Sequence, residues 1–190
     1  QFTMPAGDVE IHADAKYDAY HVSLATANVT VNSLTDATKG SPIEVGVTPI
    51  PAGNTVSFAA TADAGYTITS VTVFDTVTKQ YIPVTYDANN GGIYSFTMPS
   101  ADVKITLTAE KNKASLVILD NDNTLLGIEV VTEGSSVTVS GDTISVDVNS
   151  YTAAAVPGYT FHEWQRTADQ TQFNSHTAIT GYFIVKPVYN

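Results

Sequence analysis

Residues 96–109 read FTMPSADVKITLTA, and residues 2–13 carry a shorter version of the same phrase, FTMPAGDVEIHA. In the longer copy, a strand of alternating apolar residues must end before Pro99, because proline cannot donate to a strand ladder. A turn follows, in which the carboxylate of Asp102 can accept backbone N–H bonds. Val103 then begins a second strand. We therefore predict that the phrase is the closing corner of a β module and that the chain is a tandem array.

The two copies of the phrase also divide the chain. Residues 1–13 are predicted to be the C-terminal strands of a preceding repeat, and residues 14–110 a complete β-sandwich-like repeat module. A second, different module is expected over residues 111–190. The predicted fold class is therefore all-β, with small β domains in tandem.

Strand-like alternation runs through most of the sequence. In residues 103–108 the apolar side chains fall on one face of a strand and the polar ones on the other. The same alternation predicts a strand over residues 43–48. Turn-forming clusters, such as residues 89–92, separate the candidate strands at short intervals, which is typical of sandwich-like β domains.

Composition and charge narrow the choice of partners. The chain has 19 acidic and 8 basic residues, which gives a net charge of −11. Nucleic-acid binding needs clustered Lys and Arg, and a negative field also opposes anionic membrane surfaces. The sequence has no cysteine, which excludes disulfides and thiol catalysis. We therefore expect no nucleic-acid partner and no membrane insertion in this segment.

The first module carries a series of short motifs in a fixed order. They are Ala-Gly-Asn at 52–54, Gly-Tyr at 65–66, Val-Thr-Val at 71–73, Tyr-Ser-Phe-Thr-Met-Pro at 94–99 and Asp-Val at 102–103. In this order they resemble a repeat that is widespread in large secreted and surface-anchored bacterial proteins. The resemblance covers most of residues 20–110.

A second set of motifs lies in the last module. It comprises EGSSV at 133–137, PGYTFHEW at 157–164, FN at 173–174 and AITG at 178–181. These motifs resemble the internalin-B type repeat of bacterial surface proteins, in which a glycine usually stands where this chain has Glu163. The resemblance implies a compact β-grasp-like fold, with room for one short helix between Gln165 and Asn174.

Both resemblances imply the same class of function. The modules would be non-catalytic parts of a bacterial cell-surface or secreted protein, lying outside the cell, and would act as a stalk or spacer with an added role in adhesion. A partner would be a host or microbial surface protein or a glycan, and the chain itself is expected to be a monomer. Neither family carries a catalytic residue, so we expect no enzyme activity and no cofactor. The alternative is a carbohydrate- or host-matrix-binding module.

Two groups of residues have the chemistry of metal ligands, and a structural interpretation is preferred for both. His162 and His176 share a module with Glu163 but lack the close spacing of a zinc site. Residues 120–124 offer oxygen ligands at alternate positions, but the loop lacks the glycine and the final glutamate of a calcium loop. Asp and Asn are also the residues that a hairpin turn requires. We therefore predict no metal site.

Aromatic side chains are the best candidates for ligand contact. Tyr17, Tyr20 and His21 lie close together along the sequence, and Tyr81, Tyr86 and Tyr94 flank one predicted hairpin. The candidate ligand contacts are Tyr17, Tyr20, Tyr81 and Tyr86. Tyrosine rings present a broad apolar face and a polar tip, which suits the apolar surfaces of sugars. Cross-strand packing between the rings is the alternative explanation. Trp164, by contrast, is predicted to be a core anchor because of its place in the Gly-Tyr-Thr-Phe motif.

Overall fold

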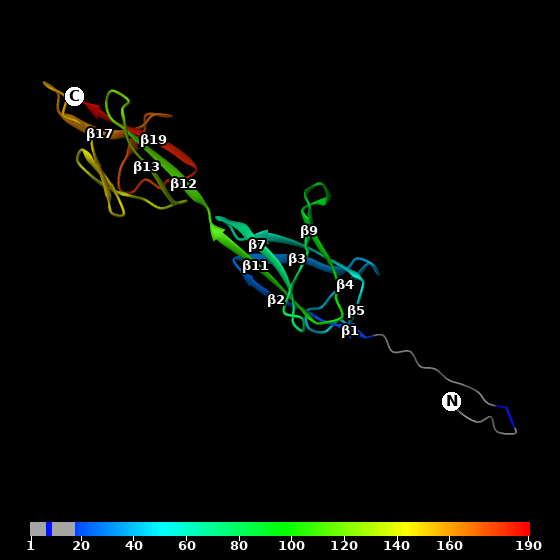
Figure 1. Cartoon of the computed structure of the whole chain (residues 1–190). Coiled ribbons are helices and arrows are strands. Elements are labelled where there is room, and N and C mark those ends of the chain that lie inside the picture. Colours follow the sequence, from blue (N-terminus) through cyan, green and yellow to red (C-terminus); the bar gives the residue numbers. More distant parts are fainter. Residues whose placement is uncertain (1–6, 9–17) are drawn as a thin grey trace. The chain divides into compact units, whose positions relative to one another are not determined.

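The computed structural model describes residues 7–8 and 18–190 (Figure 1). Within this part, the chain divides into two compact units: the first extends to Thr61 and includes Ile68–Thr108, and the second holds Ala62–Thr67 and Ala109–Asn190. The predicted end of a preceding repeat, residues 1–13, lies outside the described residues except for Gly7 and Asp8. The repeat boundaries stay a prediction, because a division into compact units does not define where a repeat begins.

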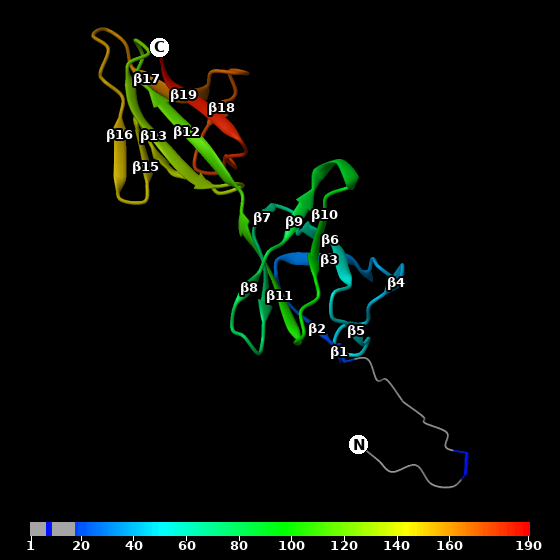
Figure 2. The ribbon, with the colours of Figure 1, turned by 45° about the vertical axis from the view of Figure 1, so that its right-hand side comes forward.

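The first unit is built from short antiparallel hairpins and one parallel strand pair. Its strands are β1 (Ala19–Tyr20), β2 (Val22–Ala27), β3 (Val29–Asp36), β4 (Ser41–Pro42), β5 (Ile50–Pro51), β6 (Thr55–Ala62), β7 (Tyr66–Asp75), β8 (Tyr81–Ile82), β9 (Thr85–Asp87), β10 (Ile93–Thr97) and β11 (Val103–Lys111). They form a five-stranded sheet in the order β4-β3-β6-β10-β9 and a four-stranded sheet in the order β2-β11-β7-β8, while β1 pairs with β5 (Figure 2). The sandwich-like prediction for this module is confirmed.

The repeated phrase is the corner that connects these two sheets. Phe96 and Met98, at the end of β10 in the five-stranded sheet, are 4% and 1% exposed, and Val103 and Ile105 of β11 in the other sheet are fully buried. At the turn between them, Asp102 accepts the backbone N–H of His21 with its carboxylate at 2.7 Å. The carboxylate therefore ties the turn to the residue before β2, and the phrase forms the corner between the two sheets that the sequence predicted.

The second unit has a mixed sheet and a smaller antiparallel one. Its strands are β12 (Lys113–Leu119), β13 (Leu125–Thr132), β14 (Thr138–Ser140), β15 (Thr143–Val146), β16 (Asn149–Thr152), β17 (Phe161–Arg166), β18 (Gln172–Phe173) and β19 (Tyr182–Tyr189). The five-stranded sheet has the order β13-β12-β19-β17-β18, and β14-β15-β16 form a meander. The first and last strands of the unit, β12 and β19, are parallel neighbours within the mixed sheet, which fits the β-grasp-like prediction.

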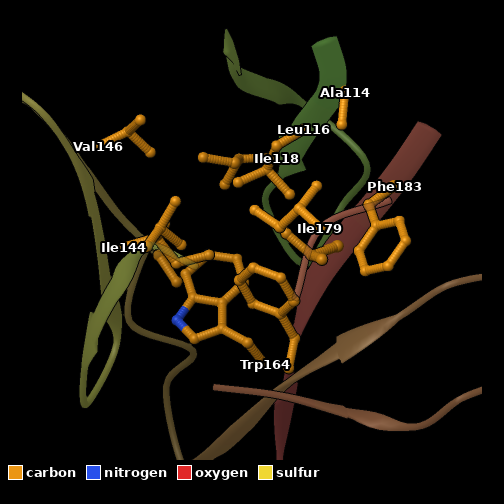
Figure 3. Close-up of a cluster of buried hydrophobic side chains, with 12 residues drawn as sticks. Ala114, Leu116, Ile118, Ile144, Val146, Trp164, Ile179 and Phe183 are labelled. Carbon is orange, nitrogen blue, oxygen red and sulfur yellow. The ribbon is translucent and has the colours of Figure 1, made fainter. Parts of the chain in front are cut away.

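Side chains from both sheets of the second unit meet in one apolar core. Leu116 and Ile118 of β12, Ile144 of β15 and Trp164 of β17 are all 0–1% exposed in this cluster (Figure 3). Trp164 is therefore the core anchor that its motif predicted. Its indole Nε1–H has no hydrogen-bond partner among the described residues.

The two units repeat one strand order. The sequence β2-β11-β7-β8 in the first unit corresponds to β12-β19-β17-β18 in the second. In each, the first strand of this order, β2 or β12, lies parallel to the last strand of its unit, β11 or β19. The next strand in the sheet follows a Gly-Tyr pair, at Gly65 and Gly158, whose φ angles of +79° and +84° favour glycine. The two modules therefore share an architecture that their sequences only partly reveal.

The short helix considered for residues 165–174 is absent, and this prediction was wrong. The segment is the β17–β18 hairpin: the N–H of Gln170 donates to the carbonyl oxygen of Arg166 at 2.9 Å, and Gln170 has a φ of +57°. Asp169 accepts both the N–H and the hydroxyl of Thr171 with one carboxylate oxygen. These bonds close a tight turn, whose left-handed residue cannot continue a helix.

The strand predicted over residues 43–48 is also wrong. The segment after Ile43 is a turn, in which Gly46 has a φ of +72° and the N–H groups of Val47 and Thr48 donate to the carbonyl oxygen of Glu44. Val47 is 60% exposed, so the alternation of valines here has no core to face. In the described part of the chain the one helical element is the 3₁₀ turn Ala88–Asn90, and no helix is long and apolar enough to cross a membrane.

Candidate functional site

The three candidate tyrosines that the structure describes lie on three different strands. Tyr17 lies outside the described residues, and Tyr20 is half-buried in β1, where it pairs with Ile50. Tyr81 and Tyr86 are 70% and 58% exposed. They lie on β8 and β9, which are the edge strands of the two different sheets of the first unit. The candidate surface is therefore the sheet edges at β8 and β9, and Tyr20 does not belong to it.

Tyr86 is the outer end of a row of aromatic rings. Tyr94 lies directly opposite Tyr86 on one side and Phe58 on the other, across β9, β10 and β6. The ring centroids are 4.7 Å apart for Tyr86 and Tyr94 and 5.3 Å apart for Tyr94 and Phe58. Phe58 is only 1% exposed, so the row leads from the core to the sheet edge. The exposed ring of Tyr86 is thus held in place by packed rings behind it.

Tyr94, which the sequence grouped with Tyr81 and Tyr86 but left out of the four candidate contacts, belongs to this aromatic row. Burial raises the pKa of its phenol, and the neighbouring Tyr86 raises it further. Because Tyr94 alternates with Phe96 along the strand, the sequence placed its side chain on the core-facing side of the sheet. Only the pairing of β9 with β10 shows that the same face continues outward to an exposed ring.

A polar loop lies beside the exposed ring. Asp87 accepts the N–H of Asn89 at 3.0 Å and so caps the 3₁₀ turn between β9 and β10. Gly92 ends this loop with a φ of +73°, and a Cβ atom there would lie 3.1 Å from the hydroxyl oxygen of Tyr86. Glycine therefore leaves room for the ring, and the exposed amides of Asn89 and Asn90 add hydrogen-bonding groups nearby. Tyrosine rings with an apolar face and a polar tip are enriched at interfaces.

Tyr81 packs against Phe74 and not against the aromatic row that ends at Tyr86. It lies opposite Phe74 across β7 and β8, with ring centroids 5.4 Å apart in an edge-to-face arrangement. Such pairs contribute to the packing of a sheet whether or not a ligand binds. The ring face that remains exposed is available for contact.

The polar groups weighed as metal ligands take structural roles. In residues 7–8 and 18–190, no group of three or more His, Cys, Asp and Glu side chains could hold a metal ion. Asp120 accepts the N–H groups of Asn121 and Ala154, and Asp122 accepts that of Thr124. The Thr124 hydroxyl and N–H lower the pKa of Asp122. These contacts are those of a hairpin turn.

The sequence does not predict the burial of two carboxylates in the first unit. Asp36 and Asp75 are 2% and 6% exposed, at the C-terminal ends of β3 and β7. Asp75 accepts the N–H groups of Val77 and Thr78, and the bond from Thr78 is the main cause of its lowered pKa. Both carboxylates cap turns. In the sequence, the signal for such a cap is an Asp followed within four residues by Thr and Lys, as in residues 36–39 and 75–79.

The fold therefore defines a class of protein, in which two small β domains with the same strand order are joined in tandem. A family model described as the divergent InlB B-repeat domain matches residues 27–113 and 127–187. The chain therefore belongs to the divergent InlB B-repeat family. A search of curated proteins finds no match.

The family match confirms one of the two resemblances and does not confirm the other. The internalin-B type repeat predicted over residues 111–190 is confirmed for 127–187. The same family also covers residues 27–113, for which the sequence resembled a separate class of repeat. That separate class is not confirmed, and the common strand order of the two units favours a common family.

Proposed function

We propose that the chain is a pair of non-catalytic repeat modules from a bacterial cell-surface or secreted protein, where they act as a stalk or spacer. The observation that carries this proposal is the placement of the terminal strands. In the second unit the first strand, β12, and the last, β19, are hydrogen-bonded parallel neighbours, and in the first unit β2, which follows the two-residue strand β1, pairs in the same way with the last strand, β11. The repeat family supports the class of protein, and the extracellular location follows from that class.

Parallel terminal strands suit a module that carries load. When a chain is pulled by its two ends, parallel neighbours are pulled in opposite directions along their length. The bonds between them are then loaded in shear and must break together, whereas a hairpin pulled at its open end loses one pair at a time. In the second unit this shear pair is β12 and β19, registered from Ser115 and Tyr182 to Ile118 and Val185. Its inward side chains belong to the apolar core.

Single-molecule force measurements test the proposal. Handles on Lys113→Cys and Asn190→Cys load β12 against β19 in shear. Handles on Lys113→Cys and Thr132→Cys load the open end of the β12–β13 hairpin, where these two residues are direct partners. We expect unfolding at clearly higher force in the first geometry. Equal forces in the two geometries would remove the mechanical argument for a stalk.

A carbohydrate- or host-matrix-binding role is the second candidate. The observation in its favour is that Tyr81 and Tyr86 are 70% and 58% exposed, with Tyr86 on a packed aromatic row. The labelled chain should then bind members of a glycan and matrix-protein panel saturably. Tyr86→Ala should abolish this binding, and Tyr159→Ala, which removes a ring that is 64% exposed in the other unit, should not. If the chain binds no member of the panel, the spacer role is the one candidate that remains.

A further inference from the structure

We propose that the outer edge of β13 binds an extended segment of a partner protein as an added strand. The segment would carry apolar residues at alternate positions and no net negative charge. This interaction goes beyond a spacer role, and it belongs to the second unit rather than to the tyrosine-bearing edges of the first.

The first support is the place of β13 in its sheet. β13 is the terminal strand of the order β13-β12-β19-β17-β18, and in the described part of the chain it pairs only with β12. An edge strand presents unpaired backbone N–H and C=O groups, which form a template for another strand. β13 spans eight residues, Leu125–Thr132, and its pairing with β12 shifts register at Leu126. The regular stretch from Gly127 to Thr132 is still long for an edge, since natural edges are commonly short.

The outward side chains of β13 carry no charge that would oppose an added strand. Ile128 and Val130 point away from the core and are 59% and 65% exposed, and Leu125 is 53% exposed. The one charged residue of the strand, Glu129, lies opposite the buried Leu116 and therefore faces inward. A charge that points outward would normally discourage pairing at such an edge. Here the outward face is apolar.

The charge of Glu129 is already used within the unit. Its carboxylate accepts the side-chain amide of Asn149 at 2.7 Å and the hydroxyl of Tyr151, both on β16. These bonds hold the meander over the inner face of β13. They also keep the carboxylate away from the side on which a strand would add.

A groove continues the edge. It has a volume of about 580 Å³, within the usual range for ligand sites. Val130–Thr132 and Lys113 form one wall, and residues 135–138 and 145–147 line the rest, so that serine and threonine hydroxyls stand beside the end of the strand. Hydroxyls can donate to and accept from a peptide backbone, so the groove suits an extended chain better than a compact ligand.

Charge decides between a partner and a second copy of this chain. With 19 acidic and 8 basic residues, a second copy would bring a further net charge of −11 to the contact. Like charge opposes association, and a neutral or basic strand is favoured instead. The groove wall itself carries one base and one acid, Lys113 and Asp147, so the choice rests on the net charge of the chain.

Nuclear magnetic resonance titration of the isotope-labelled full chain tests this proposal. The probe is a capped peptide of alternating Val and Thr with Lys at both ends. We expect saturable shifts of the amide signals of β13 and of the groove residues. Replacing the terminal Lys by Glu should weaken binding severalfold. A peptide with inner prolines, which cannot form a strand ladder, should not bind.

Two variants sharpen the test. Ile128→Lys places a charge on the edge and should weaken binding at least tenfold. Val148→Lys adds the same charge at a side chain that is 96% exposed and lies outside β13, so binding should be unchanged. Ile128→Thr, which keeps the β-branched shape, guards against misfolding as the cause and should weaken binding less.

Other outcomes would overturn the proposal. Equal binding of the proline peptide, or shifts confined to other strands, would show that no strand is added at β13. Concentration-dependent dimers that Ile128→Lys abolishes would identify a second copy as the occupant instead of a partner.

Discussion

The ring of Tyr151 lies directly over Gly127. A Cβ atom at position 127 would be 2.1 Å from the Cε1 atom of that ring, which is closer than real atoms approach. The hydroxyl of the same ring donates to Glu129, two residues along β13. Glycine in a strand weakens it, and a ring laid across the glycine restores packing there. This contact holds β16 against the inner face of β13.

Gly127→Ala should therefore destabilise the second unit by about 1–3 kcal/mol, the usual cost of overpacking. In a Tyr151→Leu background the same substitution should cost much less, because the ring is no longer in the way. Denaturant unfolding of the four proteins gives this coupling. Equal costs in both backgrounds would show that the ring does not limit position 127.

Asp36→Ala should cost about 1–3 kcal/mol, the penalty of leaving buried partners unpaired. The carboxylate accepts the N–H groups of Thr38 and Lys39 and the side-chain amide of Asn54. Glu44→Ala removes an exposed carboxylate in the same unit and serves as the control. Comparable losses of stability for both variants would contradict the capping role.

Ile144→Ala should lower the free energy of unfolding of the second unit by about 2–5 kcal/mol, because it leaves a cavity beside Trp164. Trp164 is the single tryptophan of the chain, so its fluorescence reports on this core. Val148→Ala, at a side chain that is 96% exposed, should change stability by less than about 0.5 kcal/mol. An unchanged transition in Ile144→Ala would place the residue outside the core.

Acid should destabilise the chain. The pKa values of Asp75, Asp122 and Asp169 are lowered in the folded state, for Asp75 mainly by the N–H of Thr78 and for the other two mainly by the hydroxyl of a threonine two residues on. The stabilisation is present above the unfolded pKa of about 4 and is lost as the pH falls through the folded values. Urea midpoints measured from pH 6 to pH 2 should fall, and Asp169→Asn should reduce the fall.

Alkali should also destabilise the chain, because tyrosine pKa values that are raised by folding make stability fall as the pH rises. Burial raises the pKa values of Tyr94 and Tyr189, and the bond to Glu129 raises that of Tyr151. The stabilisation is present below the unfolded pKa of about 10 and is lost as the pH rises through the folded values. Tyr151→Phe should show a smaller loss between pH 9 and pH 12 than Tyr159→Phe, which changes an exposed ring. An identical profile for both variants would remove Tyr151 from this account.

Local patterns predicted much of the fold correctly. The alternation of residues 103–108 and the proline before it predicted the closing corner, because a strand without a ladder donor must end and turn. The motif around Trp164 predicted a core position, which its 1% exposure bears out. The alternation of valines at residues 43–48 misled, since periodicity alone does not say whether a core lies beside it.

What the sequence by itself determined is the class of structure: an all-β chain of small tandem modules, rich in turns and acidic, because these depend on short-range backbone preferences and on composition. The tertiary structure alone decided which strands are neighbours. The parallel pairing of β12 with β19, the aromatic row that ends at Tyr86 and the open edge at β13 all join residues far apart in the chain. Such pairings are selected by burial of a common core, and no local pattern records them.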